Sequence, residues 1–211
     1  MGNARSKTED SETRRGIPSL LPRTAPRWLT DPVVGALARL GVTPNMLTLA
    51  GVAGNVGAGA LAAMGEFLPA GILVLAASSL DLFDGALARA TGQATDFGSV
   101  LDAVMDRVSE AAVLFGLLIY YSDRGGQTEE ILAFAAVAGS ILVSYVRARA
   151  EIVGLKLREG LFTRTERVAV LGIGLMLGLV TEMLWVLAPL AGLTAAQRLF
   201  LVWRELGRRK G

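Results

Sequence analysis

Residues 67–90 read FLPAGILVLAASSLDLFDGALARA, and this stretch decides the class of fold. It carries no charge before Asp81, and it is long enough for a helix to cross a bilayer core, which takes ~20 apolar residues. Backbone groups in lipid must pair within their own segment, so such a stretch is expected to be helical. It therefore predicts a membrane-spanning helix whose last turns carry charged residues.

Five further stretches have the same character. They cover residues 45–65, 97–121, 130–153, 167–185 and 187–206, with short loops between them. Of the 211 residues, 52% are apolar and only 19% are charged, and the mean hydropathy is +0.48. A soluble domain usually has about a quarter of its residues charged. Since no internal repeat is visible, the sequence predicts one all-α integral membrane domain with six transmembrane helices.

The two ends of the chain are more polar. Residues 26–42 mix apolar side chains with Arg27, Asp31 and Arg39, which favours an amphipathic helix lying at the membrane interface, with an ordinary linker as the alternative. Residues 1–25 form a polar tail that we expect to be disordered. The predicted organisation is this tail, a juxtamembrane helix at 26–42, the six-helix domain at 43–206 and a basic tail at 207–211.

Lysine and arginine residues fall mainly on one side of the predicted topology. They precede the first span, end the second, surround the loop between the fourth and fifth, and follow the sixth. The opposite loops are acidic, with Arg124 as their only basic residue. By the positive-inside rule, both termini and the basic loops are expected to be cytoplasmic, in the cell membrane.

The chain contains neither cysteine nor histidine. This excludes disulfides, a thiolate nucleophile and a zinc–thiolate site, and it removes the commonest general base. Any chemistry must rest on carboxylates, arginines, hydroxyl groups or a bound metal.

Four aspartates lie within the second and third predicted spans. Asp81 and Asp84 are three residues apart, and Asp102 and Asp106 are four apart. Each spacing puts both carboxylates on one helix face, and the short turn at residues 91–96 brings the two faces together. Charged residues inside a span are costly and are functional candidates by default.

Four converging carboxylates repel one another and need a counter-charge. The only fixed positive charges expected near them are Arg89 and Arg107. A divalent cation is therefore expected, and oxygen ligands favour Mg²⁺, Mn²⁺ or Ca²⁺. A pair of such ions between carboxylates is a known arrangement for displacement at phosphorus. The alternatives are buried ion pairs with the two arginines, or a proton relay.

The spacing of these residues resembles a known family signature. Residues 81–106 read DLFDGALARATGQATDFGSVLDAVMD and resemble D-x2-D-G-x2-A-R-x8-G-x3-D-x3-D of the CDP-alcohol phosphatidyltransferases. Every fixed position is met, by Asp81, Asp84, Gly85, Ala88, Arg89, Gly98, Asp102 and Asp106. The resemblance covers roughly residues 40–206. It implies a six-helix membrane core that transfers a phosphatidyl group from a CDP-linked lipid to a hydroxyl acceptor.

The resemblance also implies a role for each residue. The four aspartates would hold two Mg²⁺ or Mn²⁺ ions that bridge the donor pyrophosphate, and Asp106 would also be the general base and catalytic residue. Contacts to the CDP group would come from Asn45, Met46, Leu47, Thr48, Gly85, Arg89 and Thr95. The first four belong to the segment TPNMLT at 43–48, which resembles a family motif but is also a plausible turn and helix cap.

A second cluster of residues points to the acceptor. Ser144, Arg147, Arg164, Arg167 and Arg198 could together form a cationic pocket for a phosphate, because arginine binds phosphate through a forked pair of donors. The alternative is that arginines at helix ends contact anionic lipid headgroups.

The segments around this cluster resemble the prokaryotic phosphatidylinositol phosphate synthases, which share S-Y-x-[KR]-A-R-A-E, R-x-E-R and Q-R-L. That resemblance implies CDP-diacylglycerol as donor, inositol 1-phosphate as acceptor and CMP as the released product. The phosphatidylglycerophosphate synthases are the nearest rival, but they often end the signature with D-P-x-A-D-K, whereas residues 102–107 read DAVMDR.

Three further expectations stay open. An archaeal version of the enzyme would use an ether-linked donor. A membrane transporter is the alternative from another class, although neither paired repeats nor broken helices are visible. Family resemblance alone predicts a homodimer, and we expect membrane lipids but no nucleic acid as partners.

Overall fold

The computed structural model describes residues 27–155, 157 and 160–209. The predicted polar tail at residues 1–25 and the last two residues of the predicted basic tail lie outside this part of the chain. Within it, the protein is entirely helical, with seven helices and no strand. They are α1 (Arg27–Arg39), α2 (Pro44–Met64), α3 (Phe67–Thr91), α4 (Asp96–Ser122), α5 (Gln127–Ile152), α6 (Arg164–Met176) and α7 (Val180–Arg208).

Local chemistry explains several helix ends. Thr43 caps α2, since its side chain accepts a hydrogen bond from the backbone N–H of Met46. Thr95 caps α4 in the same way, through the N–H of Gly98. Gly65 ends α2 in the left-handed conformation, at φ 86°. The first four predicted spans match α2 to α5 within a few residues.

The fifth predicted span is wrong in its extent. Residues 167–185 do not form one helix: α6 ends at Met176 and α7 begins at Val180. Gly178 lies between them at φ 68°, a backbone conformation that glycine adopts without the steric cost of a Cβ atom. The sequence stays apolar through the break, so hydrophobicity alone does not reveal it.

Four helices in the described part of the chain, α2, α3, α5 and α7, are long and apolar enough to cross a membrane. Helix α4 is long enough but carries several charges, among them Asp106, Arg107 and Glu110. Helix α6 has 13 residues, or ~20 Å of length, which is less than a bilayer core of ~30 Å. The protein is thus an all-helical multi-pass membrane protein, and the count of six spans stays a prediction.

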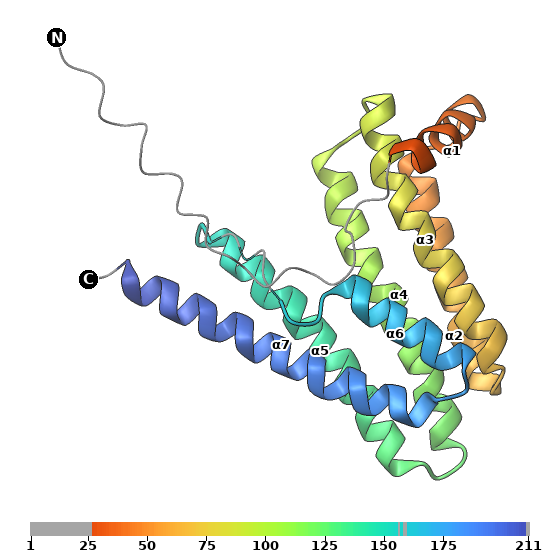
Figure 1. Ribbon diagram of the computed structural model, residues 1–211, viewed down its shortest axis with the longest axis vertical. Coiled ribbons are helices and arrows are strands. Elements are labelled where there is room, and N and C mark those ends of the chain that lie inside the picture. Colours follow the sequence, from red (N-terminus) through yellow and green to blue (C-terminus); the bar gives the residue numbers. More distant parts are fainter. Residues whose placement is uncertain (1–26, 156, 158–159, 210–211) are drawn as a thin grey trace.

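The helices form two groups, the first made of α1 to α4 and the second of α5 and α7, which meet at one end and separate at the other (Figure 1). Helix α2 packs against α3 and α4, α5 runs along α7, and α6 packs mainly on α3. The α2–α4 contact is very close, because a methyl group at Gly59 or Gly116 would collide with the backbone of the opposite helix. The main core, at the converging end, includes the fully buried Leu114, Leu175 and Leu184.

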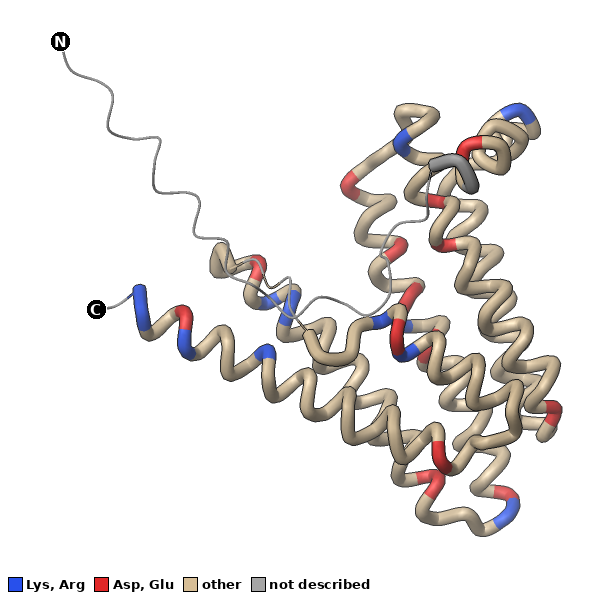
Figure 2. Tube along the Cα trace, in the orientation of Figure 1, with Lys and Arg blue, Asp and Glu red and all other residues tan. Residues whose placement is uncertain are grey.

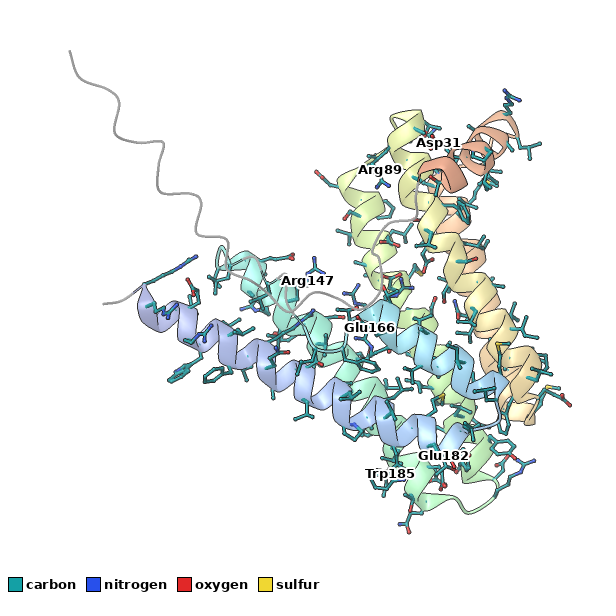
Figure 3. The ribbon with its side chains drawn as sticks, in the orientation of Figure 1. Asp31, Arg89, Arg147, Glu166, Glu182 and Trp185 are labelled. Carbon is teal, nitrogen blue, oxygen red and sulfur yellow. The ribbon has the colours of Figure 1, made fainter. Side chains whose placement is uncertain are left out.

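Helix α1 lies across the separated end of the first group (Figure 1). Its Val34 packs against Leu47 of α2 and Leu87 of α3 in a small second core. Figure 3 shows Arg89 and Arg147 at the separated ends of the helices, and Glu182 and Trp185 at the converging end.

Candidate active site

The structure brings the four aspartates of α3 and α4 into one region near the separated end. Asp81 and Asp84 lie one turn apart on α3, and Asp102 and Asp106 lie one turn apart on α4. Their charges repel across the two helices, with Asp102 acting on Asp84 and Asp81 acting on both Asp102 and Asp106. Figure 2 shows acidic positions recurring along both helices.

An arginine from a distant part of the chain sits between two of these acids. Nη2 of Arg164 lies 2.5 Å from Oδ2 of Asp81 and 2.9 Å from Oδ1 of Asp106. The expectation that Arg89 and Arg107 are the only nearby positive charges is therefore wrong. Arg164 opens α6, which the fold returns against α3, and sequence distance conceals this approach.

Asp84 is fixed by two neighbours. Its Oδ2 accepts a hydrogen bond from the hydroxyl of Thr48 on α2 at 2.9 Å, and its Oδ1 accepts one from the backbone N–H of Gly85 at 2.5 Å. Both Asp84 and Thr48 are buried. The start of α2 is thereby joined to the aspartate cluster.

A first cavity of about 250 Å³ opens beside this junction. It is lined by Pro44, Asn45, Thr48, Asp84, Gly85, Ala88, Arg89, Gln93, Ala94, Thr95, Gly98, Ser99 and Asp102. Five of the seven residues predicted to contact CDP are among them. Of the other two, Met46 is exposed and Leu47 packs in the small core with Val34.

A second cavity of about 290 Å³ lies between α4, α5, α6 and α7. It is lined by Asp106, Arg107, Glu110, Val143, Ser144, Arg147, Thr163, Arg164, Thr165, Arg167 and Arg198. All five residues predicted for the acceptor phosphate are among them. Asp102 lines the first cavity and Asp106 the second, one turn apart, so the aspartate face of α4 runs between the two.

The arginines of the second cavity have different surroundings. Nη1 of Arg198 donates to the carbonyl oxygen of Val143 at 2.9 Å, and Nε of Arg147 pairs with the exposed Glu151 at 3.0 Å. The buried Nε of Arg164 finds no hydrogen-bond partner within the described residues. Arg164 thus keeps one donor for a bound group.

Arg167 is held by an acid that sequence reasoning missed. Its Nε and Nη2 donate to the two carboxylate oxygens of Glu110, at 2.7 and 2.9 Å, and both side chains are buried. Glu110 follows Asp106 by four residues, so it continues the face that carries Asp102 and Asp106. That four-residue spacing could have identified Glu110 as a site residue from the sequence.

The start of α6 is fixed by a capping box. Oε2 of Glu166 accepts hydrogen bonds from both the backbone N–H and the hydroxyl of Thr163. Glu166 is buried, and Figure 3 shows it at the level where the two helix groups begin to separate. Because Arg164 is the first residue of α6, this cap also sets its position.

The residues present fit a divalent cation by their chemistry. Four partly or wholly buried carboxylates supply hard oxygen ligands. Among the described residues, however, no group of three or more acids is arranged to hold a metal ion. Arg164 lies between Asp81 and Asp106, and Asp84 accepts two hydrogen bonds.

Comparison with known proteins follows this geometry. Residues 41–203 match the family model described as CDP-alcohol phosphatidyltransferase. The phosphatidylinositol phosphate synthase of Mycobacteroides abscessus is 38% identical over 193 residues, which cover 87% of each chain. The archaetidylinositol phosphate synthase of Pyrococcus horikoshii is 37% identical over 171 residues, covering 81% of this chain and 88% of the relative.

Solved structures of the phosphatidylinositol phosphate synthase of Mycobacterium tuberculosis are also similar. The crystal structure with CDP-DAG bound has a TM-score of 0.78 and 32% identity, and the match covers 83% of this chain and 94% of that one. The complex with manganese and citrate has a TM-score of 0.75 and 33% identity, covering 82% and 88%.

Proposed function

The chain belongs to the CDP-alcohol phosphatidyltransferase family, and we propose that it transfers the phosphatidyl group of CDP-diacylglycerol to inositol 1-phosphate. The reaction releases CMP and forms phosphatidylinositol phosphate. One observation carries the proposal: two cavities flank the aspartate face of α4, the first beside Asp102 and the second beside Asp106, and the second is lined by arginines. This is the layout that a nucleotide-linked donor and an anionic acceptor require.

The first cavity suits the donor. The similar structure from M. tuberculosis holds CDP-DAG, and the residues lining the cavity here combine small side chains, hydroxyl groups and Arg89. Arg89 can neutralise phosphate charge, and Asn45, Thr48 and Thr95 offer hydrogen-bonding groups. Met46 and Leu47, the other two residues expected to contact the donor, lie on the same first turns of α2 but outside the lining of this cavity.

Divalent metal is proposed at the four aspartates, and the manganese complex of the similar enzyme supports it. Asp81, Asp84, Asp102 and Asp106 would hold two ions, with Mg²⁺ or Mn²⁺ as the candidates. When bound, such ions neutralise charge on the pyrophosphate oxygens of a donor. Arg164 would then have to leave Asp81 or Asp106.

Asp106 is the proposed general base. Its carboxylate lines the second cavity, one turn from Asp102, which lines the first. An acceptor hydroxyl placed between Asp102 and Asp106 can pass its proton to Asp106. Its oxygen then attacks the phosphorus that carries the diacylglycerol. The new P–O bond forms as the P–O bond to CMP breaks, and CMP leaves as the anion.

The second cavity suits an acceptor that carries its own phosphate. Arg147, Arg164 and Arg198 reach it from three helices, and Ser144 adds a hydroxyl group. The buried Nε of Arg164, which has no hydrogen-bond partner in the described part of the chain, is a donor suited to a phosphate oxygen. Arg167 lines the same cavity, but its forked donors already contact Glu110.

An ether-linked donor is the second candidate. The archaetidylinositol phosphate synthase of P. horikoshii is 37% identical, close to the 38% of the M. abscessus enzyme. The two names share the inositol phosphate part and differ in the lipid. Both donors would present the same CDP group to the first cavity and use the same acceptor in the second.

The same proposal includes the membrane arrangement. Residues 43–206 would form a six-helix domain from α2 to α7, with α1 lying at the interface and 207–211 as a basic tail. Lysine and arginine positions gather mostly at the separated end, which would face the cytoplasm with both termini and the active site (Figure 2). A homodimer is proposed on family resemblance.

Acceptor selectivity tests this function. Purified protein with CDP-diacylglycerol and Mg²⁺ should release CMP with inositol 1-phosphate, and much less with glycerol 3-phosphate or free inositol. Asp106→Asn protein gives the background rate. Equal rates with free inositol would contradict an acceptor phosphate site, and preference for glycerol 3-phosphate would assign the rival acceptor.

A further inference from the structure

Glu110 and Arg167 close the buried end of the second cavity. The cavity reaches from Arg147, whose side chain is 56% exposed, to Glu110 and Arg167, which are 6% and 4% exposed. Glu110 comes from α4 and Arg167 from α6. These two helices have few close backbone contacts, because α6 packs mainly on α3. The ion pair therefore bridges a gap that the helix backbones leave open.

The pair is fully bonded. Both carboxylate oxygens of Glu110 accept from Arg167, at 2.7 and 2.9 Å, and Oε2 also accepts from the hydroxyl of the buried Ser140 at 2.7 Å. Nη1 of Arg167 is 3.4 Å from the carbonyl oxygen of Phe162. Three helices, α4, α5 and α6, are thereby joined, and the positive charge of Arg167 is neutralised where it is buried.

The pair lies one turn from the reacting carboxylate. Asp106 precedes Glu110 by four residues on α4, about 6 Å along the axis. Arg164 precedes Arg167 by three residues on α6 and contacts Asp106. Asp106 is also the only other acid among the described residues that line the cavity. If Glu110 lost its charge, the buried Arg167 would have Asp106 as its alternative partner.

We propose that Glu110 is a positioning residue that holds Arg167 away from Asp106. With Glu110 charged, Arg167 stays paired inside the wall of the cavity, and Asp106 has Arg164 but not Arg167 as a neighbouring positive charge. The inference rests on the proposed function, since it takes Asp106 as the base. It assigns the acceptor phosphate to the remaining arginines of the cavity and not to Arg167.

Two variants test this role. Glu110→Gln keeps a side chain of similar shape that can bond Ser140, but leaves Arg167 unneutralised. We expect kcat, counted per site that binds CDP-diacylglycerol, to fall roughly tenfold or more. The double variant Glu110→Gln with Arg167→Gln also removes the unpaired positive charge of Arg167. There kcat should recover to within about threefold of the parent, with the acceptor KM changed by less than about threefold.

Counting active sites separates this role from a purely structural one, which would lower the number of binding sites and not their turnover. Glu129→Gln is the matched control, because Glu129 also accepts a hydroxyl hydrogen bond, from Thr181, but at the converging end of the molecule. It should keep the parent kcat and acceptor KM.

Three results would overturn the proposal: unchanged kcat per site in Glu110→Gln, a double variant no better than the single, or an acceptor KM raised about tenfold in the double variant. The last would make Arg167 a direct phosphate ligand, and it decides the matter even if Glu110→Gln alone fails to fold. Failure of the proposed function is seen separately, as loss of turnover with inositol 1-phosphate in the parent protein. The variant ratios would then be measured with whichever acceptor supports turnover.

Discussion

At the scale of single residues, Asp106 is the side chain on which turnover should depend most. Asp106→Asn removes the proposed base, so we expect kcat to fall by roughly 10²–10⁴-fold, the usual contribution of general base catalysis. CDP-diacylglycerol binding should stay largely intact, because loss of a base and one proposed metal ligand weakens the transition state more than ground-state contacts, and the first cavity is lined by other residues. Turnover and direct lipid binding measured on the same protein check this. Asp96→Asn makes the same chemical change at the exposed start of α4 and should keep normal turnover.

Arg198 gives a separate prediction at this scale. It is buried, lines the second cavity from α7 and is absent from the lining of the first, so its removal should act mainly on the acceptor. Loss of a hydrogen bond to a charged group costs about 1.5–3 kcal/mol, so Arg198→Ala should raise the acceptor KM roughly tenfold or more. The KM for CDP-diacylglycerol should change much less. Arg149→Ala is the control, because Arg149 is exposed and lies outside both cavities. An equal rise of the acceptor KM in this control would contradict a specific role of Arg198.

At the scale of helices, the contact between α2 and α4 is the most sensitive to volume. A Cβ atom at Gly116 would meet the backbone of Gly59, which cannot move aside as a side chain can. Gly116→Val should therefore cost about 1–3 kcal/mol or more and lower the melting temperature in detergent by several degrees. Gly192→Ala on α7 adds a methyl group with no atom within 4 Å and should leave it unchanged. Equal melting temperatures for the two variants would show that the close crossing is not needed.

Helix positions were largely predictable from sequence, whereas contacts between distant helices were not. The apolar lengths predicted α2 to α5 closely, and the plausible cap in the segment at 43–48 is formed by Thr43. The break at Gly178 escaped because the residues around it remain apolar. Spacing brought the four aspartates together, but Arg164 reaches Asp81 across 83 positions of sequence, and no local pattern reports such a contact. Only the fold shows it.

At the scale of the whole molecule, the two ends of the helices should face opposite sides of the membrane. The chain has no cysteine, so single cysteines can report exposure without background. Asp123→Cys lies in the α4–α5 connection at the converging end, and Arg208→Cys ends α7 at the separated end. A membrane-impermeant maleimide should label the first in intact cells, and the second only after the membrane is opened. The reverse pattern would invert the proposed orientation.

Identification of the product tests the central claim most directly. Purified protein given CDP-diacylglycerol and inositol 1-phosphate should form a lipid that carries two phosphates, one from the phosphatidyl group and one from inositol 1-phosphate. Mass spectrometry should find this lipid in an amount equal to the CMP released. Both products should disappear in chelator and return with Mg²⁺ or Mn²⁺, because four carboxylates are proposed to bind metal. CMP release with phosphatidic acid in place of the two-phosphate lipid, or full activity in chelator, would contradict metal-dependent transfer to inositol 1-phosphate.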